Sequence, residues 1–174
     1  MSGIHNTAFV LAGGGSFGAV QVDMLKALIG HGVKPDLVVG ASAGAINGAY
    51  LAGRPDVAGI QDLERLWLTT NRRDIFPLTM RTWVRVLVKR DFLLDPSGLL
   101  ALIDRNLPYR HLEDAAVPIH IITTDFLSGA MRVLSTGPAA RAVVASCAIP
   151  AAFPSIEIGG LPRGNQDESQ RQSG

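Results

Sequence analysis

Two glycine-rich turns constrain this chain more strongly than any other feature of its sequence. The first, Gly13–Gly18, follows the short apolar run Thr7–Ala12, and the second, Gly40–Gly44, follows the apolar run Leu37–Val39. A helix-compatible sequence continues from each turn. Strand, turn and helix repeated in this way predict an α/β fold with a parallel sheet. Because ligands of open α/β folds bind beyond the carboxyl ends of the strands, both turns are expected at that edge of the sheet.

Apolar periodicity and the positions of proline and glycine predict the remaining elements. The expected helices span 19–31, 43–52, 56–70, 95–106 and 138–148, and in the fourth of them Asp95 is the expected cap and Pro96 the first helical residue. The expected later strands span 119–124, 131–135 and 156–158. The residues that share one face of the first helix are Val20, Met24, Leu25 and Leu28. The residues expected to face inward from the third helix are Ile60, Leu63 and Trp67.

Length and composition narrow the class of protein. The length of 174 residues fits one domain. Apolar residues make up 47% of the chain, and its net charge of +1 gives no reason to expect nucleic acid as a partner. The single cysteine excludes an internal disulfide framework, and no metal or cofactor is predicted. No signal peptide and no membrane span are predicted either. We expect a cytoplasmic protein with an N-terminal tail over 1–6, one domain over 7–160 and a polar, disordered tail over 161–174.

The second turn contains the pattern Gly-x-Ser-x-Gly, with Ser42 at its centre. Between a strand and a helix, this pattern is typical of a nucleophile elbow, in which the serine side chain projects above the sheet. Glycines at positions 40 and 44 carry no Cβ that would clash in so sharp a turn. The alternative interpretation is an ordinary strand-to-helix turn whose serine caps the helix. The sequence therefore marks Ser42 as the candidate nucleophile.

The first turn has two interpretations. Its pattern Gly-x-Gly-x-x-Gly, with Asp36 about 20 residues further on, satisfies the dinucleotide-binding fingerprint. Alternatively, the backbone N–H groups of Gly13, Gly14 and Gly15 form an oxyanion hole, with Gly18 opening the following helix. A nucleophile on the neighbouring strand favours the second interpretation, because both groups then meet at one edge of the sheet.

Taken together, these motifs resemble the patatin-like phospholipase family. The matching segments are Gly13–Gly18, Gly40–Ala49, Thr123–Asp125 with Gly129, and Ala145–Pro154. The resemblance extends over about Thr7 to Gly160. It implies a three-layer α/β/α domain with a mainly parallel sheet that hydrolyses lipid acyl esters through a Ser–Asp dyad. By this resemblance Ser42 is the nucleophile and Gly13–Gly15 form the oxyanion hole.

The chain departs from the family pattern at the catalytic base. The family aspartate lies in an Asp-Gly-Gly or Asp-Gly-Ala motif beyond the position of Gly160, and this chain contains no Asp-Gly pair. Asp167 and Asp125 are the remaining candidates, although Asp125 is better explained as a turn cap. We therefore expect weak or no hydrolysis by this chain. A non-catalytic protein that binds acyl lipids or dinucleotides is the alternative.

Basic residues give one further indication about partners. Arg81, Arg85 and Lys89 are spaced by four and line one face of an expected helix that also contains Trp83. Such a stripe is either a solvated surface or a peripheral contact with an anionic membrane. The small residues around Cys147 predict a core position for its side chain. Nothing in the sequence indicates the oligomeric state.

Overall fold

The computed structural model describes residues 7–69, 96–125 and 128–147. The strands are β1 (Ala8–Leu11), β2 (Leu37–Ala41), β3 (Ile119–Thr124) and β4 (Met131–Leu134). The α-helices are α1 (Gly18–Gly30), α2 (Ala43–Gly53), α3 (Val57–Thr69), α6 (Pro96–Asn106) and α7 (Ala139–Cys147), and two short 3₁₀ helices span Gly15–Phe17 and Leu112–Asp114. The expected strand over 156–158 and the basic stripe at 81–89 lie outside the described residues, as do the two expected tails.

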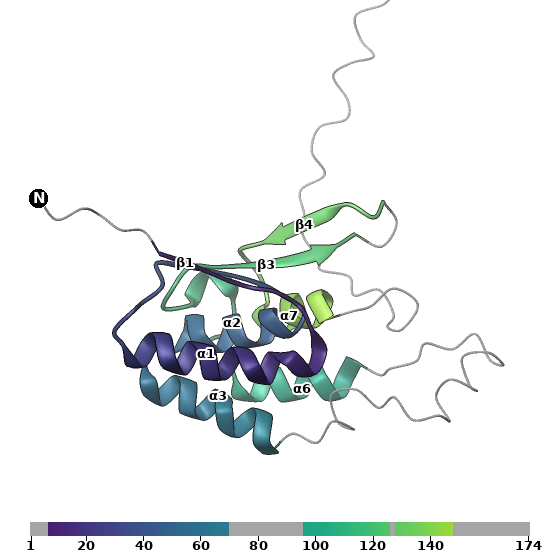
Figure 1. Ribbon diagram of the computed structural model, residues 1–174. Coiled ribbons are helices and arrows are strands. Elements are labelled where there is room, and N and C mark those ends of the chain that lie inside the picture. Colours follow the sequence, from purple (N-terminus) through teal and green to yellow (C-terminus); the bar gives the residue numbers. More distant parts are fainter. Residues whose placement is uncertain (1–6, 70–95, 126–127, 148–174) are drawn as a thin grey trace, which may run out of the picture.

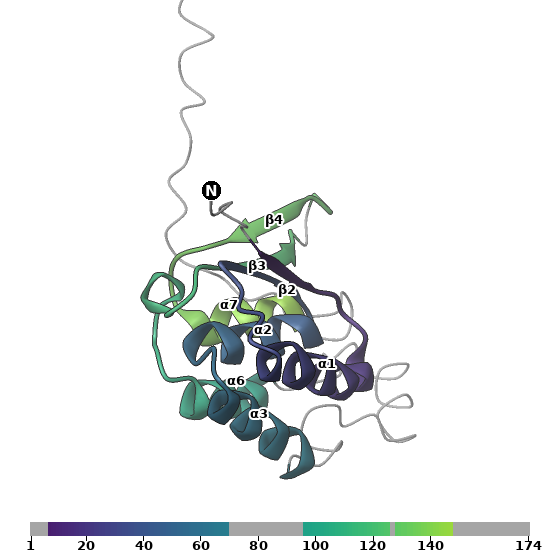
Figure 2. The ribbon, with the colours of Figure 1, turned by 60° about the vertical axis from the view of Figure 1, so that its left-hand side comes forward.

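The four strands form a single sheet in the order β1-β2-β3-β4. The pairs β1–β2 and β2–β3 are parallel, while β4 returns antiparallel to β3. Figures 1 and 2 show the labelled helices on one side of this sheet. The expected α/β fold with a mainly parallel sheet is confirmed, and in the described part of the chain the helices cover one of its faces.

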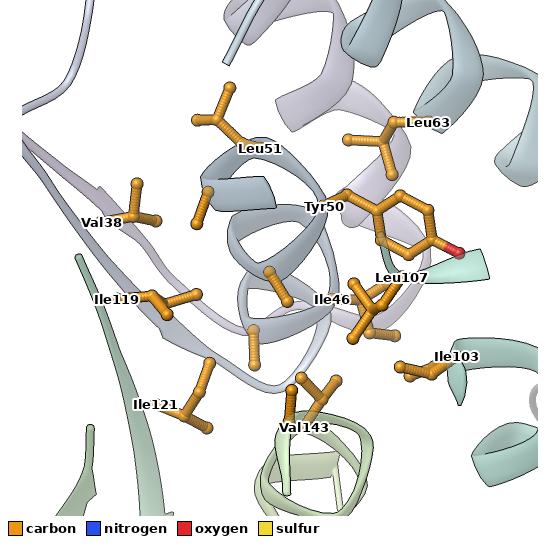
Figure 3. Close-up of a cluster of buried hydrophobic side chains, with 14 of the residues drawn as sticks. Val38, Ile46, Tyr50, Leu51, Leu63, Ile103, Leu107, Ile119, Ile121 and Val143 are labelled. Atoms are coloured by element: carbon orange, nitrogen blue, oxygen red, sulfur yellow. The ribbon is translucent and has the colours of Figure 1, made fainter. Parts of the chain in front are cut away.

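The helix α2 forms the centre of the core. Every residue from Ala43 to Ala52 is buried, because strands cover one side of the helix and other helices cover the rest. Figure 3 shows Val38, Ile119 and Ile121 facing it from the strands, with Val143 of α7 beside them. The small residues that make α2 look featureless in the sequence allow this close packing on all sides.

Local signals set the ends of several helices. Asp56 caps α3 as expected, since its carboxylate accepts a hydrogen bond from the Gly59 amide at 2.7 Å and its carbonyl accepts one from Ile60 at 3.1 Å. Pro96 is the first residue of α6, where its missing N–H leaves no partner unsatisfied. After α1, Gly32 adopts φ 80°, a left-handed conformation that glycine tolerates and that turns the chain toward β2.

The inward face of α1 differs from the expected one. Its buried apolar residues are Val22, Leu25 and Ile29. Of the four residues predicted to share a face, only Leu25 is buried, while Val20, Met24 and Leu28 are exposed. Apolar residues lie on two sides of this helix, so periodicity alone cannot select the buried side, and packing against α2 and α3 selects it. In α3 the prediction is confirmed, because Ile60 and Leu63 are buried and Trp67 packs against the core.

Candidate active site

The residue Ser42 forms the whole connection between β2 and α2. β2 ends at Ala41 and α2 begins at Ala43, so the chain must reverse its local direction at one residue. Ser42 has φ 52° and ψ −122°, and it is the one non-glycine residue with positive φ in the described ranges. For a residue with a side chain, this backbone conformation is strained. The conformation is the one expected of a nucleophile elbow.

The two flanking glycines are required by close approach of the backbone. A Cβ at Gly40 would lie 2.5 Å from the Gly44 carbonyl oxygen, which belongs to the first turn of α2. A Cβ at Gly44 would collide with the Leu11 carbonyl and lie 2.7 Å from the carbonyl oxygen of Ala12. Because Gly40 and Gly44 carry a hydrogen atom in place of a Cβ, α2 can start directly against β1 and β2.

The glycine loop after β1 lies directly beside Ser42. A Cβ built on Gly13 would be 3.1 Å from the Ser42 Cβ and 3.8 Å from its Oγ. Gly15 adopts φ 56°, which permits the tight 3₁₀ turn that leads into α1. At the start of α1, a Cβ on Gly18 would lie 2.5 Å from the ring of Trp67. The parallel pairing of β1 with β2 brings the two glycine-rich turns together, as the sequence predicted.

A second serine holds the backbone of the first. The amide of Ser42 donates a hydrogen bond to the Ser146 Oγ at 2.8 Å, and that hydroxyl donates to the Ile122 carbonyl at 2.5 Å. Ser146 lies in α7, 104 positions along the chain from Ser42. The sequence analysis included Ser146 in a family-like segment but assigned it no role, because nothing local indicates a contact at such a separation.

Asp125, one of the two candidates for the base, organises the turn between β3 and β4. Its Oδ1 accepts hydrogen bonds from the amide and hydroxyl of Ser128, both at 2.9 Å. Its other carboxylate oxygen lies 3.8 Å from Arg132. Asp167 lies outside the described residues. His120 is a half-buried residue within β3, and its buried Nδ1 has no partner in the described part of the chain.

The acidic residue of the dinucleotide fingerprint occupies the wrong end of the sheet for that function. Asp36 precedes β2, and its carboxylate accepts a hydrogen bond from the Thr7 amide at 2.7 Å, next to the start of β1. The glycine loop follows the opposite end of β1. A dinucleotide bound at the loop would need its acidic partner beyond the carboxyl end of β2, and that position belongs to Ser42.

Burial determines the state of the nearby thiol. Cys147 is buried at the end of α7, and desolvation of its thiolate raises the pKa of the thiol to about 12. This side chain is therefore an inert core residue at neutral pH, as the sequence predicted.

No group of three or more potential ligands for a metal ion occurs within the described residues. Among these residues, no helix has the length and apolar character needed to cross a membrane.

The fold is that of an α/β protein in which a one-residue strand-to-helix connection at Ser42 lies beside a glycine loop. A family model described as "Patatin-like phospholipase" matches residues 9–165. The chain therefore belongs to the patatin-like phospholipase family.

Relatives and one solved structure agree with this assignment. Patatin-like phospholipase domain-containing protein 7 of Rattus norvegicus is 31% identical over 152 residues, which cover 86% of this chain. Patatin-like phospholipase domain-containing protein 6 of Homo sapiens is 30% identical over 152 residues, or 87% of this chain. The chain spans 11% of the length of each of these relatives.

The structural comparison supports the fold. A chain in the crystal structure of full-length SpcU with full-length ExoU, from the type III secretion system of Pseudomonas aeruginosa, superimposes with a TM-score of 0.55. The match covers 86% of this chain and 39% of that chain, at 18% sequence identity.

Proposed function

We propose that this chain carries the nucleophile and the oxyanion hole of a hydrolase that acts on acyl esters of lipids. Ser42 is the nucleophile, and the backbone N–H groups of Gly13–Gly15 stabilise the oxyanion. The observation that carries this proposal is the strained Ser42 backbone directly beside Gly13, whose built Cβ would lie 3.1 Å from that of Ser42. Membership in the patatin-like phospholipase family supports a lipid as the substrate.

The proposed reaction has two acyl-transfer steps. A general base takes the Ser42 proton while the Oγ attacks the ester carbonyl, and the loop amides hold the negative charge that develops on the carbonyl oxygen. The bond to the lipid alcohol then breaks, and this alcohol leaves with the proton from the base. Water activated by the same base attacks the acyl-enzyme, which releases the fatty acid and restores the Ser42 hydroxyl.

The base of the family dyad is the missing component. The sequence of these 174 residues contains no Asp-Gly pair, and the hydrogen bonds of Asp125 with Ser128 favour a structural role for its carboxylate. Asp167 is the other candidate for the base. We therefore propose that this chain hydrolyses esters slowly, because general-base assistance is worth about 10²–10⁴-fold in rate.

The nucleophile is tested with a fluorophosphonate probe, which labels activated serines covalently. The wild-type chain should be labelled at one site, and Ser42→Ala should remove the label. Ser135→Ala is the matched control, since Ser135 is also a serine but is exposed just after β4. Equal labelling of Ser42→Ala and Ser135→Ala would refute the assignment.

The base is tested by extending the chain. Replacing residues 161–174 with a family-like continuation that contains Asp-Gly-Gly should raise ester hydrolysis by about 10²–10⁴-fold. The same continuation with Asn-Gly-Gly is the control and should give no increase. Rapid turnover by the unmodified chain would contradict the proposal, and separate Asp125→Asn and Asp167→Asn variants would then identify the base in use.

An exposed apolar row supports presentation of the substrate at a lipid surface. The row begins at the last residue of the 3₁₀ turn and continues at helical spacing along the outer side of α1. Its residues are Phe17, Val20, Met24 and Leu28, with exposed fractions of 72%, 55%, 62% and 38%. The row starts at the end of the glycine loop, so a surface that contacts it also lies next to the proposed oxyanion hole. Apolar rows of this kind favour contact with the acyl region of a membrane.

A further inference from the structure

The buried polar residue Asn47 lies at the centre of a hydrogen-bond chain that ends at the glycine loop. Asn47 is fully buried in α2, and it is the one buried polar or charged residue in the described part of the chain. Its Oδ1 accepts a hydrogen bond from the Trp67 indole N–H at 2.8 Å. Its Nδ2 donates to the Gly18 carbonyl at 2.8 Å and to the Gln21 Oε1 at 3.0 Å. Both amide hydrogens and the amide oxygen are therefore paired.

The chain of hydrogen bonds continues from Gln21 to the loop. The Gln21 Nε2 donates to the carbonyl oxygen of Ala12 at 2.7 Å. The direction of every bond follows from its two ends, because an indole N–H only donates and a backbone carbonyl only accepts. Trp67 therefore orients Asn47, Asn47 orients Gln21, and Gln21 presents a donor to Ala12. A reversed amide at either Asn47 or Gln21 would place two acceptors or two donors against each other.

The hold on Ala12 sets the direction of the Gly13 amide. A peptide group is planar and trans, so the carbonyl of Ala12 and the N–H of Gly13 point to opposite sides of one rigid unit. The carbonyl is directed toward Gln21 and lies close to Gly44, where a Cβ would be 2.7 Å away. Gly13 itself lies beside Ser42. Fixing the carbonyl therefore fixes the donor that the proposed oxyanion hole uses nearest to the nucleophile.

We propose that Gln21, Asn47 and Trp67 are positioning residues that hold the Ala12–Gly13 peptide in the orientation needed to stabilise the oxyanion. This inference rests on the proposed function of Ser42. It links α3, which carries Trp67, to the reaction at the carboxyl edge of the sheet. A donor that is aligned before the reaction needs no reorganisation as charge develops.

The inference is tested by the kinetics of fluorophosphonate labelling at Ser42 in the full 174-residue chain. Gln21→Met keeps the length of the side chain and removes both of its hydrogen bonds. It should lower the maximal labelling rate by about 10–10²-fold, with unchanged half-saturation by the probe, since misplaced groups lose transition-state stabilisation. A general loss of folded protein would lower the labelled amount instead of this rate.

Two further variants complete the design. Trp67→Phe keeps an aromatic side chain but removes the indole N–H together with one ring of the indole, so it should lower the same rate in the same direction. Lys26→Met is the matched control, because it removes the contact of Lys26 with Glu64 between α1 and α3 without touching the loop. A Gln21→Met rate equal to that of Lys26→Met would overturn the proposal, and an unchanged Trp67→Phe rate would overturn the role of Trp67.

A second measurement separates this inference from the proposed function. The amide signal of Gly13 in a nitrogen–proton correlation spectrum reports on its peptide group without any reaction. It should move in Gln21→Met and stay in place in Lys26→Met. If the wild-type chain is never labelled at Ser42, the proposed function fails, and the Gly13 signal alone decides the positioning. An unmoved Gly13 signal in Gln21→Met would overturn it.

Discussion

The strained backbone of Ser42 predicts that glycine at this position stabilises the protein. At φ 52° and ψ −122°, a residue with a Cβ carries a cost of about 1–3 kcal/mol that glycine does not carry. Glycine loses about 0.5–1 kcal/mol more than alanine in backbone entropy on folding. The difference favours Ser42→Gly over Ser42→Ala by about 1 kcal/mol in the free energy of unfolding. Both variants lack the hydroxyl, so the comparison isolates the backbone.

The measurement is the thermal unfolding of both variants. The control compares alanine with glycine at an ordinary helical position. For a chain of 174 residues, about 1 kcal/mol shifts Tm by roughly 2–4 °C, so Ser42→Gly should melt that much higher than Ser42→Ala. Ala27→Gly on the exposed side of α1 should have the opposite sign, because helical alanine is favoured over glycine by about 0.5–1 kcal/mol. A Ser42→Gly variant that melts no higher than Ser42→Ala would refute the idea that the elbow stores strain.

Three further predictions follow from the same contacts. Ser146→Ala leaves the Ser42 amide without its acceptor and should lower the free energy of unfolding by about 1–3 kcal/mol, whereas Ser146→Thr, which keeps a hydroxyl, should lose less on chemical denaturation. Cys147, whose pKa is raised to about 12, should resist iodoacetamide at pH 8 until denaturant is added, and fast native modification would contradict its burial. Met24→Ser should weaken sedimentation with phosphatidylcholine vesicles, while Asp23→Asn on the same helix should not; equal binding would argue against the apolar row as a lipid contact.

Local sequence determined most of the elements and the form of the turn at Ser42. The strand Ile119–Thr124 and the start of α6 at Pro96 were predicted with their observed bounds, because a run of apolar residues and a proline act over a few positions. The glycines on both sides of Ser42 also indicated the sharp turn without any tertiary information. At positions 40 and 44 alike, only glycine leaves enough space for a strand to pass into a helix through one residue.

Only the tertiary structure decided which surfaces are buried and what holds the site in place. In α1, apolar residues lie on two sides, and the packing of α2 and α3 selected Val22 over Val20. The contacts of Ser146 with Ser42 and of Trp67 with Asn47 join segments 104 and 20 positions apart. Local patterns carry information over one or two turns of chain, whereas hydrogen bonds between distant segments exist only after the sheet and helices have assembled. The sequence could therefore mark Ser42 as a candidate nucleophile, but it could not indicate which distant residues contact its turn.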